Sequence, residues 1–468
     1  MAARPKSPNV DSVTTINPDG SHYFLHPSDA RGRFTLWRRV FAVVLLAVYI
    51  LLPWIQINGH PAVFLDTANR KFHLFGLTFL AQDLWLGFFF ITGAGFSLFY
   101  ITSLFGRLWC GWACPYTIFL EHVFRRIERI IEGDGPKRRQ LDKAPWTIGK
   151  IFRRVLKHTL YLLAAAAITH IFLSYFVSLP KLWNWMQGKP REHWLAFSII
   201  LFLTGVLYFC FAWFREQFCI MLCPYGRIQS ALTDDNTLVV GYDEKRGEPR
   251  GKAGTEGAGD CVNCIKCVQV CPTGIDIRDG LQLECIGCAA CIDACDDVMD
   301  RLQRKRGLIR YDSFNGLKGE KTQWMRPRII VYTVVMLAGA LGLLIALHTV
   351  KPLSTNLTRM AGLPYFVNAT GVRNNFQIYV TNKQQEPRTI TLTLEGAPPG
   401  TQLIGPQPNT KLGPLEEQKL VAIVDVPRAA YKGPQPMKIR IASEPGDVVV
   451  ELPFQFSGPD AKALENAK

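Results

Sequence analysis

Cysteine is missing from most of this chain of 468 residues. All 13 cysteines lie between residues 110 and 295, and none precedes or follows that stretch. Disulfide bonds therefore cannot stabilise the C-terminal part, and the gathering of the thiols in one region favours metal ligation over disulfide formation. Histidine is sparse as well, and its 9 residues form no paired pattern across apolar segments that would indicate a b-type haem site.

Charged residues make up only 19% of the chain, and five long apolar runs contain none. A helix needs roughly 17–25 such residues to cross about 30 Å of hydrocarbon. The predicted spans are residues 40–57, 84–105, 159–179, 194–214 and, within the segment 328–352, 329–347. The polar tail before the first span is longer than the charged start of a cleaved signal peptide, so we expect a retained anchor.

Lysine and arginine are distributed unevenly over the segments that flank these runs. Residues 1–39 carry 6 and residues 107–157 carry 12, whereas residues 58–83 carry 2 and residues 180–193 carry 3. The positive-inside rule then places the N-terminal tail in the cytoplasm and the C-terminal segment outside. The net charge of +15 is explained by this topology, so nucleic acid is not an expected partner.

The external segment, residues 353–468, is expected to be all β. Its stretches "NFQIYVTN", "RTITLTLEG", "LVAIVDVP" and "MKIRIAS" alternate in polarity or run β-branched between proline and glycine residues. At that spacing, a small antiparallel immunoglobulin-like sandwich of about 100 residues is the expected architecture.

Eight cysteines form two identical patterns in residues 241–327, which follow the membrane domain of residues 40–240. "CVNCIKCVQVCP" and "CIGCAACIDAC" both have the C-x2-C-x2-C-x3-C spacing of bacterial ferredoxins, in which the fourth cysteine ligates the other cluster. The predicted ligand sets are set 1, of Cys261, Cys264, Cys267 and Cys295, and set 2, of Cys271, Cys285, Cys288 and Cys291. Zinc sites built from C-x2-C pairs are the alternative, and they have to account for two identical quartets.

A second cysteine motif, C-x3-C-P, follows two of the predicted spans. It contains Cys110 and Cys114 in "CGWACPY", and Cys219 and Cys223 in "CIMLCPY". If a helix continues through each pair, the two cysteines share one helical face. Four thiols at one membrane surface could bind Cu(I), which prefers thiolate, or cycle between dithiol and disulfide. The alternative is that they are small buried hydrophobes beside prolines that mark helix ends.

Three further features carry weaker hypotheses. Cys210, inside the fourth span, is expected to pack as a small hydrophobe. His170, inside the third span, is either a functional residue with a partner in the bundle or a neutral hydrogen-bonded histidine. Residues 116–133 are expected to form an amphipathic helix, lying either at the membrane interface or against the cysteine-rich segment.

The stretches "GRLWCGWACPYT", "REQFCIMLCPYGRIQ", "YDEKRGEPRG" and "GLIRYDSFNG", together with both ferredoxin motifs, resemble the FixG/CcoG family of membrane polyferredoxins. The resemblance covers most of the chain from about residue 30. It implies a multidomain protein of the bacterial inner membrane with a five-helix bundle, a cytoplasmic ferredoxin-like insertion and a periplasmic immunoglobulin-like domain. It also implies two [4Fe-4S] clusters, with the eight ferredoxin cysteines as ligands.

The function implied by the resemblance is reduction of Cu(II) to Cu(I) for assembly of the copper centre of cbb3-type cytochrome c oxidase, with Cys110, Cys114, Cys219 and Cys223 as the thiols that meet copper. The expected partners are the lipid bilayer, copper ions, oxidase assembly factors or a copper transporter, and a cytoplasmic electron donor, while a homodimer is left open. Two other functions remain open, namely an electron relay between a quinone or cytoplasmic donor and another redox protein, and a non-enzymatic assembly scaffold.

Overall fold

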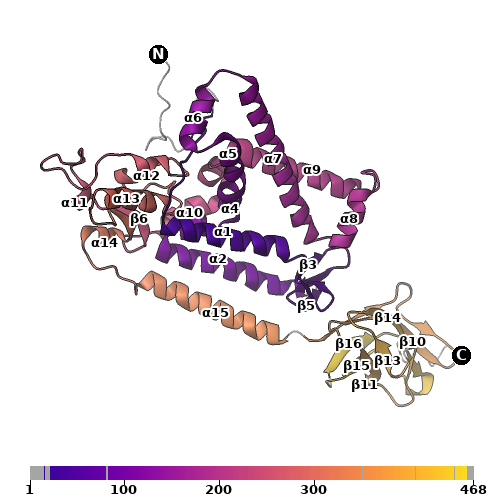
Figure 1. Cartoon of the computed structure of the whole chain (residues 1–468). Coiled ribbons are helices and arrows are strands. Elements are labelled where there is room, and N and C mark those ends of the chain that lie inside the picture. The colour runs from indigo at the N-terminus through magenta and orange to yellow at the C-terminus, as the bar shows by residue number, and fades with distance from the viewer. Residues whose placement is uncertain are drawn as a thin grey trace. The chain divides into compact units, whose positions relative to one another are not determined.

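The computed structural model describes Thr15 and residues 22–80, 83–349, 351–405, 407–446 and 448–460, with the backbone alone at Ser230. The chain divides into two compact units (Figure 1). The first unit comprises Met1–Gln56, Pro61–Leu65 and Gly87–Leu344, and the second comprises Ile57–His60, Asp66–Leu86 and Ile345–Lys468.

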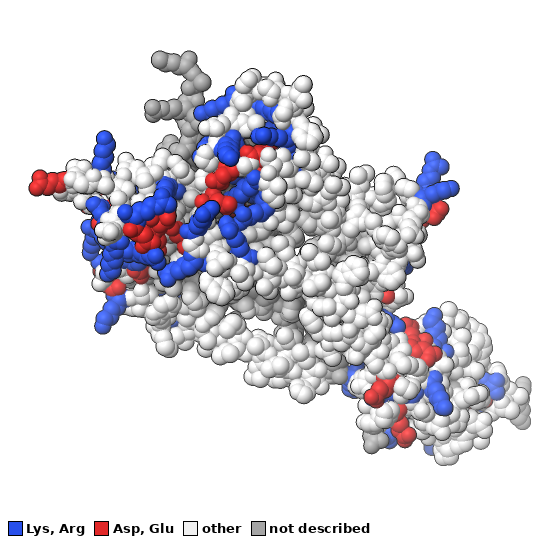
Figure 2. Space-filling view, viewed as in Figure 1, with Lys and Arg blue, Asp and Glu red and all other residues white. Residues whose placement is uncertain are grey.

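Five of the described helices are long and apolar enough to cross a membrane, as the sequence predicted. They are α1 Arg33–Leu51, α2 Trp85–Phe105, α7 Ile148–Ser174, α9 Trp194–Phe209 with its π-helical continuation η3 Cys210–Phe214, and α15 Pro327–Thr349. Lysine, arginine, aspartate and glutamate gather at one end of the first unit, while the long helices show an almost uncharged surface (Figure 2). The chain is therefore a membrane protein.

Two helices begin earlier than the predicted spans 40–57 and 159–179. Helix α1 starts at Arg33 because the Asp293 carboxylate accepts hydrogen bonds from its first backbone amides, and it ends at Leu51, just before Pro53. Helix α7 starts at Ile148, where the Thr147 side chain accepts from the backbone of Lys150. Hydropathy marks only the uncharged part of a helix, so these polar first turns were missed.

Shorter helices complete the first unit. They are α3 Leu108–Trp112, α4 Pro115–Phe119, the π-helix η2 Leu120–Phe124, α5 Arg125–Glu132, α6 Gly135–Lys143, α8 Leu179–Gln187, the π-helix η4 Phe218–Leu222, α10 Pro224–Leu232, α11 Glu244–Gly247, α12 Lys266–Gln269, the 3-10 helix η5 Ile277–Asp279, α13 Ala290–Arg301 and α14 Phe314–Lys318. Strands β6 Val239–Tyr242 and β7 Ile309–Asp312 pair antiparallel at the two ends of the cysteine-rich segment. This pairing closes the segment, called here the ferredoxin insertion, into one folded body beside the helices.

Short strands lie between α1 and α2: β1 Gln56–Ile57, β2 His60–Pro61, β3 Val63–Asp66, β4 Lys71–Leu74 and β5 Leu77–Leu80. In the second unit, β4 and β5 form an antiparallel hairpin that contacts the C-terminal domain. Lys71 Nζ donates to the Leu415 carbonyl at 2.7 Å, and Lys383 pairs with Asp83 at 2.7 Å. The hairpin and the C-terminal domain are thus joined by two side-chain contacts.

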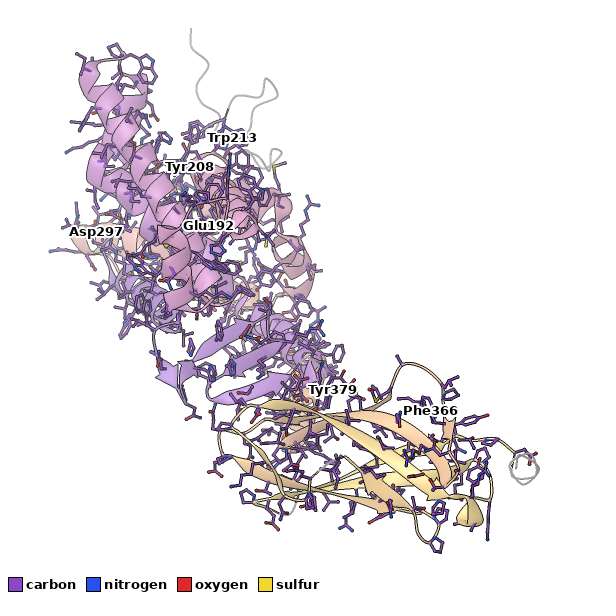
Figure 3. All side chains as sticks on the ribbon, turned by 90° about the vertical axis from the view of Figure 1, so that its right-hand side faces the viewer. Glu192, Tyr208, Trp213, Asp297, Phe366 and Tyr379 are labelled. Atoms are coloured by element: carbon purple, nitrogen blue, oxygen red, sulfur yellow. The ribbon has the colours of Figure 1, made fainter. Side chains whose placement is uncertain are left out.

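The C-terminal domain is the predicted immunoglobulin-like sandwich. Its strands are β8 Leu353–Arg359, β9 Phe366–Val367, β10 Gly371–Asn382, β11 Arg388–Glu395, β12 Gln402–Ile404, β13 Thr410–Leu412, β14 Glu417–Pro427, β15 Gln435–Glu444 and β16 Val448–Phe456, with the 3-10 helix η6 Arg428–Ala430. One sheet has the order β12-β14-β10-β8, with β9 on β10, and the other has the order β13-β11-β15-β16. Alternate residues such as Ile378 on β10 and Ile439 on β15 are fully buried between the sheets. Tyr379, also on β10, and Phe366, on β9, mark the first of these sheets in Figure 3.

Candidate redox site

The two ferredoxin motifs fold in the same way. In each motif the residue after the second cysteine, Ile265 or Ala289, adopts a left-handed conformation and caps the helix that carries the third cysteine. The residues before the second cysteine, Asn263 and Gly287, also have positive φ. Such turns direct successive backbone amides inward and form a concavity suited to an anion. A cluster ligated by four thiolates is such an anion.

The cysteines gather in the crossed arrangement that the spacing predicted. One cavity is lined by Cys261, Cys264, Cys267 and Cys295, which are all four members of set 1. A second cavity is lined by Cys271, Cys285, Cys288 and Cys291, which form set 2, together with Cys267. The fourth cysteine of each motif therefore lies with the first three of the other motif.

Burial controls the protonation of these thiols. It raises the pKa of Cys267, Cys285 and Cys295 to about 12, so they are protonated at neutral pH until a metal displaces the proton. Among the described residues, no three histidine, cysteine, aspartate or glutamate side chains are close enough to hold a single metal ion. Two identical quartets with ferredoxin spacing, each placed around one cavity, suit [4Fe-4S] clusters.

The C-x3-C-P motifs interrupt their helices, contrary to the premise that each pair shares one helical face. Cys114 ends the α3 segment in an extended conformation, and Pro115 is the first residue of α4. Cys223 has the same conformation after η4, with Pro224 first in α10. Proline disfavours helical geometry at the preceding residue and is well suited to the first helical position. Each pair thus places its two cysteines on opposite sides of a helix break.

The four thiols of the two motifs nevertheless lie near one another, and together they are called the thiol cluster. The pKa of Cys110 is raised to about 12, mainly by burial; Arg107 opposes this rise, and Cys114 and Cys223 contribute to it. Burial also raises the pKa of Cys219, and the other three thiols add to that shift. Mutual effects of this kind require close approach. All 13 cysteines, which lie wholly within the described part of the chain, are free thiols.

Tyr116, the residue after the first C-x3-C-P motif, joins the two motifs. Its ring stacks on Phe218 at 4.4 Å and on Phe211 at 5.0 Å. Its hydroxyl donates to the carbonyls of Cys210, at 3.1 Å, and Arg215, at 2.5 Å. The helix that follows the first motif is thereby fixed to the segment that precedes the second.

Set 2 lies directly against α3, the helix of Cys110. A Cβ atom at Gly111 would come within 2.6 Å of the Ile286 carbonyl and 2.9 Å of the Cys288 Cα, so only glycine fits there. Across the same contact, the Trp112 indole donates to the Tyr311 hydroxyl, which donates to the Gly287 carbonyl. The thiol cluster and set 2 are therefore neighbours, with the backbone of α3 between them.

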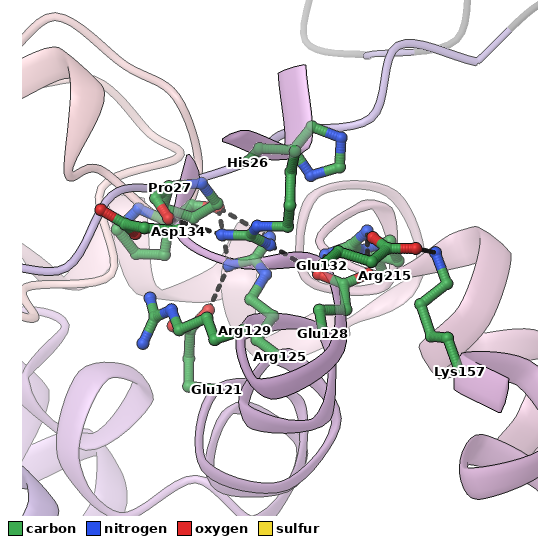
Figure 4. A network of polar contacts seen from close by, with 12 residues as sticks. His26, Pro27, Glu121, Arg125, Glu128, Arg129, Glu132, Asp134, Lys157 and Arg215 are labelled. Atoms are coloured by element: carbon green, nitrogen blue, oxygen red, sulfur yellow. Dashed lines mark hydrogen bonds and ion pairs between the residues drawn. The ribbon is translucent and has the colours of Figure 1, made fainter. Parts of the chain in front are cut away.

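A buried network of charges holds these elements together (Figure 4). Its ion pairs are Arg125 with Glu121 and Glu216, Arg138 and Arg215 with Glu128, and Lys157 with Glu132. Every one of these side chains is less than 10% exposed. The network also reaches the N-terminal segment, because Arg138 Nη2 donates to the Pro27 carbonyl at 2.8 Å.

The network supports the second alternative for residues 116–133, namely a helix that packs against the cysteine-rich segment. Arg125, placed on the polar face by a regular helical period, is fully buried, whereas Ile130 is 83% exposed. The π-helical turn η2 inserts an extra residue and rotates the following face inward. The segment packs against the ferredoxin insertion, where Arg125 donates to the Pro272 carbonyl at 3.1 Å.

The remaining sequence candidates stay outside the thiol cluster and both ferredoxin sets. His170 Nδ1 donates to the Ala166 carbonyl of its own helix at 2.7 Å. Cys210 begins the π-helical end of the fourth span. Arg107 and Gln229 were missed by sequence reasoning, although Gln229 lies 3.9 Å from the Cys110 sulfur. Neither residue belongs to a ligand motif, and only the position of Arg107 three residues before Cys110 could have indicated it.

Comparison with known proteins agrees with this architecture. A 4Fe-4S dicluster domain model matches residues 214–314, the IG-like fold at the C-terminal of FixG matches residues 343–459, and a 4Fe-4S binding domain model matches residues 86–132. The nitrogen fixation protein FixG of Rhizobium meliloti is 38% identical over 431 residues, covering 82% of this chain and 81% of that protein. Proteins RdxA and RdxB of Cereibacter sphaeroides are 37% and 36% identical, each over 80% of this chain and over 82% and 84% of their own lengths.

These matches confirm the family that the sequence motifs indicated. The relatives align over most of the chain, and the matched domains account for the ferredoxin insertion and the C-terminal sandwich. The chain belongs to the FixG family and is a membrane iron–sulfur redox protein.

Proposed function

We propose that this chain reduces Cu(II) to Cu(I) at the thiol cluster and so supplies copper for the assembly of a cbb3-type cytochrome c oxidase. The observation that carries the proposal is the convergence of Cys110, Cys114, Cys219 and Cys223 beside set 2. Thiolate ligands favour Cu(I) over Cu(II), so binding and reduction act in the same direction.

The chain's own residues have distinct parts in this proposal. Set 1 and set 2 hold two [4Fe-4S] clusters, which supply one-electron chemistry when bound. The thiol cluster binds the copper substrate, and each Cu(II) ion takes up one electron to become Cu(I). The buried thiols lose their protons on binding copper, because only the thiolate is a ligand. Tyr116 keeps the two cysteine motifs together.

The proposed topology follows the charge distribution of the sequence. The N-terminal tail and the ferredoxin insertion face the cytoplasm, where a donor reduces the clusters, and the C-terminal sandwich faces the periplasm. Oxidase assembly factors or a copper transporter are the proposed partners on the acceptor side.

A second candidate is an electron relay that transfers electrons to another redox protein without binding copper. It is favoured by the finding that no three potential ligands in the described part of the chain are placed to hold one ion. The relay needs the two clusters and a docking surface, but it does not need the thiol cluster.

The deciding experiment is anaerobic reduction of Cu(II) by the purified, cluster-reduced protein. Cu(I) is measured with a chromophoric chelator while EPR follows oxidation of the clusters. Wild type is compared with a Cys110→Ser, Cys219→Ser double variant, and Cys210→Ser, which lies outside the thiol cluster, is the control. We expect the double variant to keep its clusters and lose Cu(I) formation, while Cys210→Ser retains it. Equal Cu(I) formation by all three proteins would favour the relay.

A further inference from the structure

Arg107 lies between the thiol cluster and set 2. Its backbone contacts the set 2 loop, since a Cβ at Gly287 would lie 3.3 Å from the Arg107 carbonyl carbon and oxygen. Its guanidinium Nη2 donates to the Gly226 carbonyl on α10. Gly226 in turn packs on the second motif, because a Cβ there would lie 2.7 Å from the Cys219 carbonyl.

One cavity lies beside Arg107 and set 2. It has a volume of about 70 Å³ and is lined by Arg107 together with Gln229 and Cys285. Gln229 contacts the Cys110 sulfur, and Cys285 belongs to set 2. Arg107 is therefore close to both groups of cysteines, and its charge acts on each of them.

The charge of Arg107 is not neutralised by a neighbouring acid. Among the described residues, no carboxylate forms an ion pair with it within 4.0 Å, unlike the buried arginines of the adjoining network. Arginine stays protonated at any relevant pH. It thus presents a permanent positive charge where two groups of thiolates form when metal is bound.

We propose that Arg107 is a positioning residue shared by the thiol cluster and set 2, whose positive charge stabilises the thiolates of both. This makes set 2, and not set 1, the ferredoxin site coupled to the thiol cluster. The copper part of the inference rests on the proposed function, whereas the coupling to set 2 does not.

Arg278 provides a matched control at set 1. It lines the set 1 cavity and donates to Asp276 at 2.8 Å and to Asn263 at 2.7 Å. Its charge acts on Cys267 of set 1. Removing Arg107 or Arg278 should therefore affect different clusters, although both changes remove one arginine from the same region of the protein.

The test is an EPR-monitored redox titration of the full-length, cluster-loaded protein in detergent. Removing a nearby positive charge makes the reduced cluster less stable, so its reduction potential falls. We expect Arg107→Gln to lower the potential of one cluster, Arg278→Gln to lower that of the other, and Arg107→Lys to restore a value near wild type. A purely structural role would reduce the yield of loaded protein without moving a potential. The proposal is wrong if both glutamine variants shift the same cluster, or if Arg107→Gln shifts neither.

A second measurement tests whether Arg107 affects the thiol cluster. Cu(I) affinity is determined by competition with a chromophoric chelator, and it can be measured on the full chain without clusters should Arg107→Gln fail to retain them. We expect Arg107→Gln to weaken Cu(I) binding about tenfold and Arg278→Gln to leave it unchanged. Equal Cu(I) affinity of wild type and Arg107→Gln would show that Arg107 does not affect the thiol cluster. If wild type binds no Cu(I), the proposed function is wrong. The redox titration then still tests whether Arg107 acts on the cluster of set 2.

Discussion

The backbone carbonyl of Pro272 accepts two hydrogen bonds from the Arg125 guanidinium, at 3.1 Å from Nη1 and 3.2 Å from Nη2. Pro272 directly follows Cys271, the cysteine that the first ferredoxin motif contributes to set 2. Arg125 lies on α5, in the helical segment that follows the first C-x3-C-P motif. One buried arginine thus joins the ferredoxin insertion to the membrane helices.

Replacing Arg125 should destabilise the protein strongly. Arg125→Met leaves the Glu121 and Glu216 carboxylates buried without their cation, and breaking such a pair costs about 3–5 kcal/mol. Thermal or denaturant unfolding of the purified protein in detergent measures the loss. Arg301→Gln is the control, because its pair with Asp297 is largely exposed and should change stability by less than about 0.5 kcal/mol. Similar losses in both variants would show that the network is not a stabilising element.

Two carboxylates of this network, Glu121 and Glu128, should make stability depend on acid pH. Burial alone would raise the pKa of Glu121, but Arg125 and Arg38 lower it to about 2, and Arg215 and Arg138 keep the pKa of Glu128 low against its own burial. Because these pKa values lie below the unfolded value of about 4.3, the stabilisation is complete above that pH and is lost as the pH falls towards 2.

Glu121→Gln isolates this effect from the general acid lability of iron–sulfur clusters. The variant should be less stable than wild type at pH 7, and the difference in unfolding midpoint should shrink as the pH falls from about 4.5 towards 2. A difference that stays constant across this range would mean that Glu121 is not held ionised in the folded protein.

The crossed assignment of the cysteines can be tested by iron content. Wild type should contain about eight iron atoms per chain, in two clusters. A Cys264→Ser, Cys295→Ser double variant changes set 1 only and should retain about four. A Cys264→Ser, Cys271→Ser double variant affects both sets and should retain almost none. Ligation of each cluster by one contiguous motif predicts the opposite result for the two proteins.

Iron analysis of wild type and of a Cys110→Ser, Cys114→Ser variant tests what the thiol cluster binds. The 4Fe-4S binding domain match over residues 86–132 includes Cys110 and Cys114. Under the proposed function these thiols bind copper as substrate, so their replacement by serine should leave the iron content unchanged. A wild-type value near twelve, falling to about eight in that variant, would instead place a third cluster there.

Asp293 should anchor α1 to the ferredoxin insertion. Its carboxylate accepts from the Thr35 amide at 2.6 Å, the Thr35 hydroxyl at 2.7 Å and the Phe34 amide at 3.2 Å. Loss of such a cap costs about 0.5–2 kcal/mol, so Asp293→Ala should increase hydrogen exchange in the first turn of α1. Asp296→Ala, which removes a bond to the Gly307 amide elsewhere, should leave α1 protected. If hydrogen exchange in the first turn of α1 is unchanged in Asp293→Ala, Asp293 does not anchor this helix.

Ligand spacing made the cysteine sets predictable from sequence, because C-x2-C-x2-C-x3-C restricts how a cluster can be held. The apolar runs also predicted the five long helices, and the alternating segments predicted the C-terminal strands. The burial of Arg125 was not predicted, because a regular period of 3.6 residues cannot anticipate the π-helical turn before it. Arg107 and Gln229 act through contacts between segments more than 100 residues apart, and no local pattern reports such contacts.

The helix breaks at Pro115 and Pro224 make the thiol cluster adjustable. Had each pair occupied one continuous helix, the separation of its sulfurs would be set by the helical repeat. Instead, Cys110 and Cys114 belong to α3 and to the start of α4, and Cys219 and Cys223 are divided in the same way. A small change in the angle between two short helices alters the sulfur separation without breaking a helical hydrogen bond. Under the proposed function, the cysteine pairs can therefore follow copper as its preferred coordination geometry changes when it gains an electron.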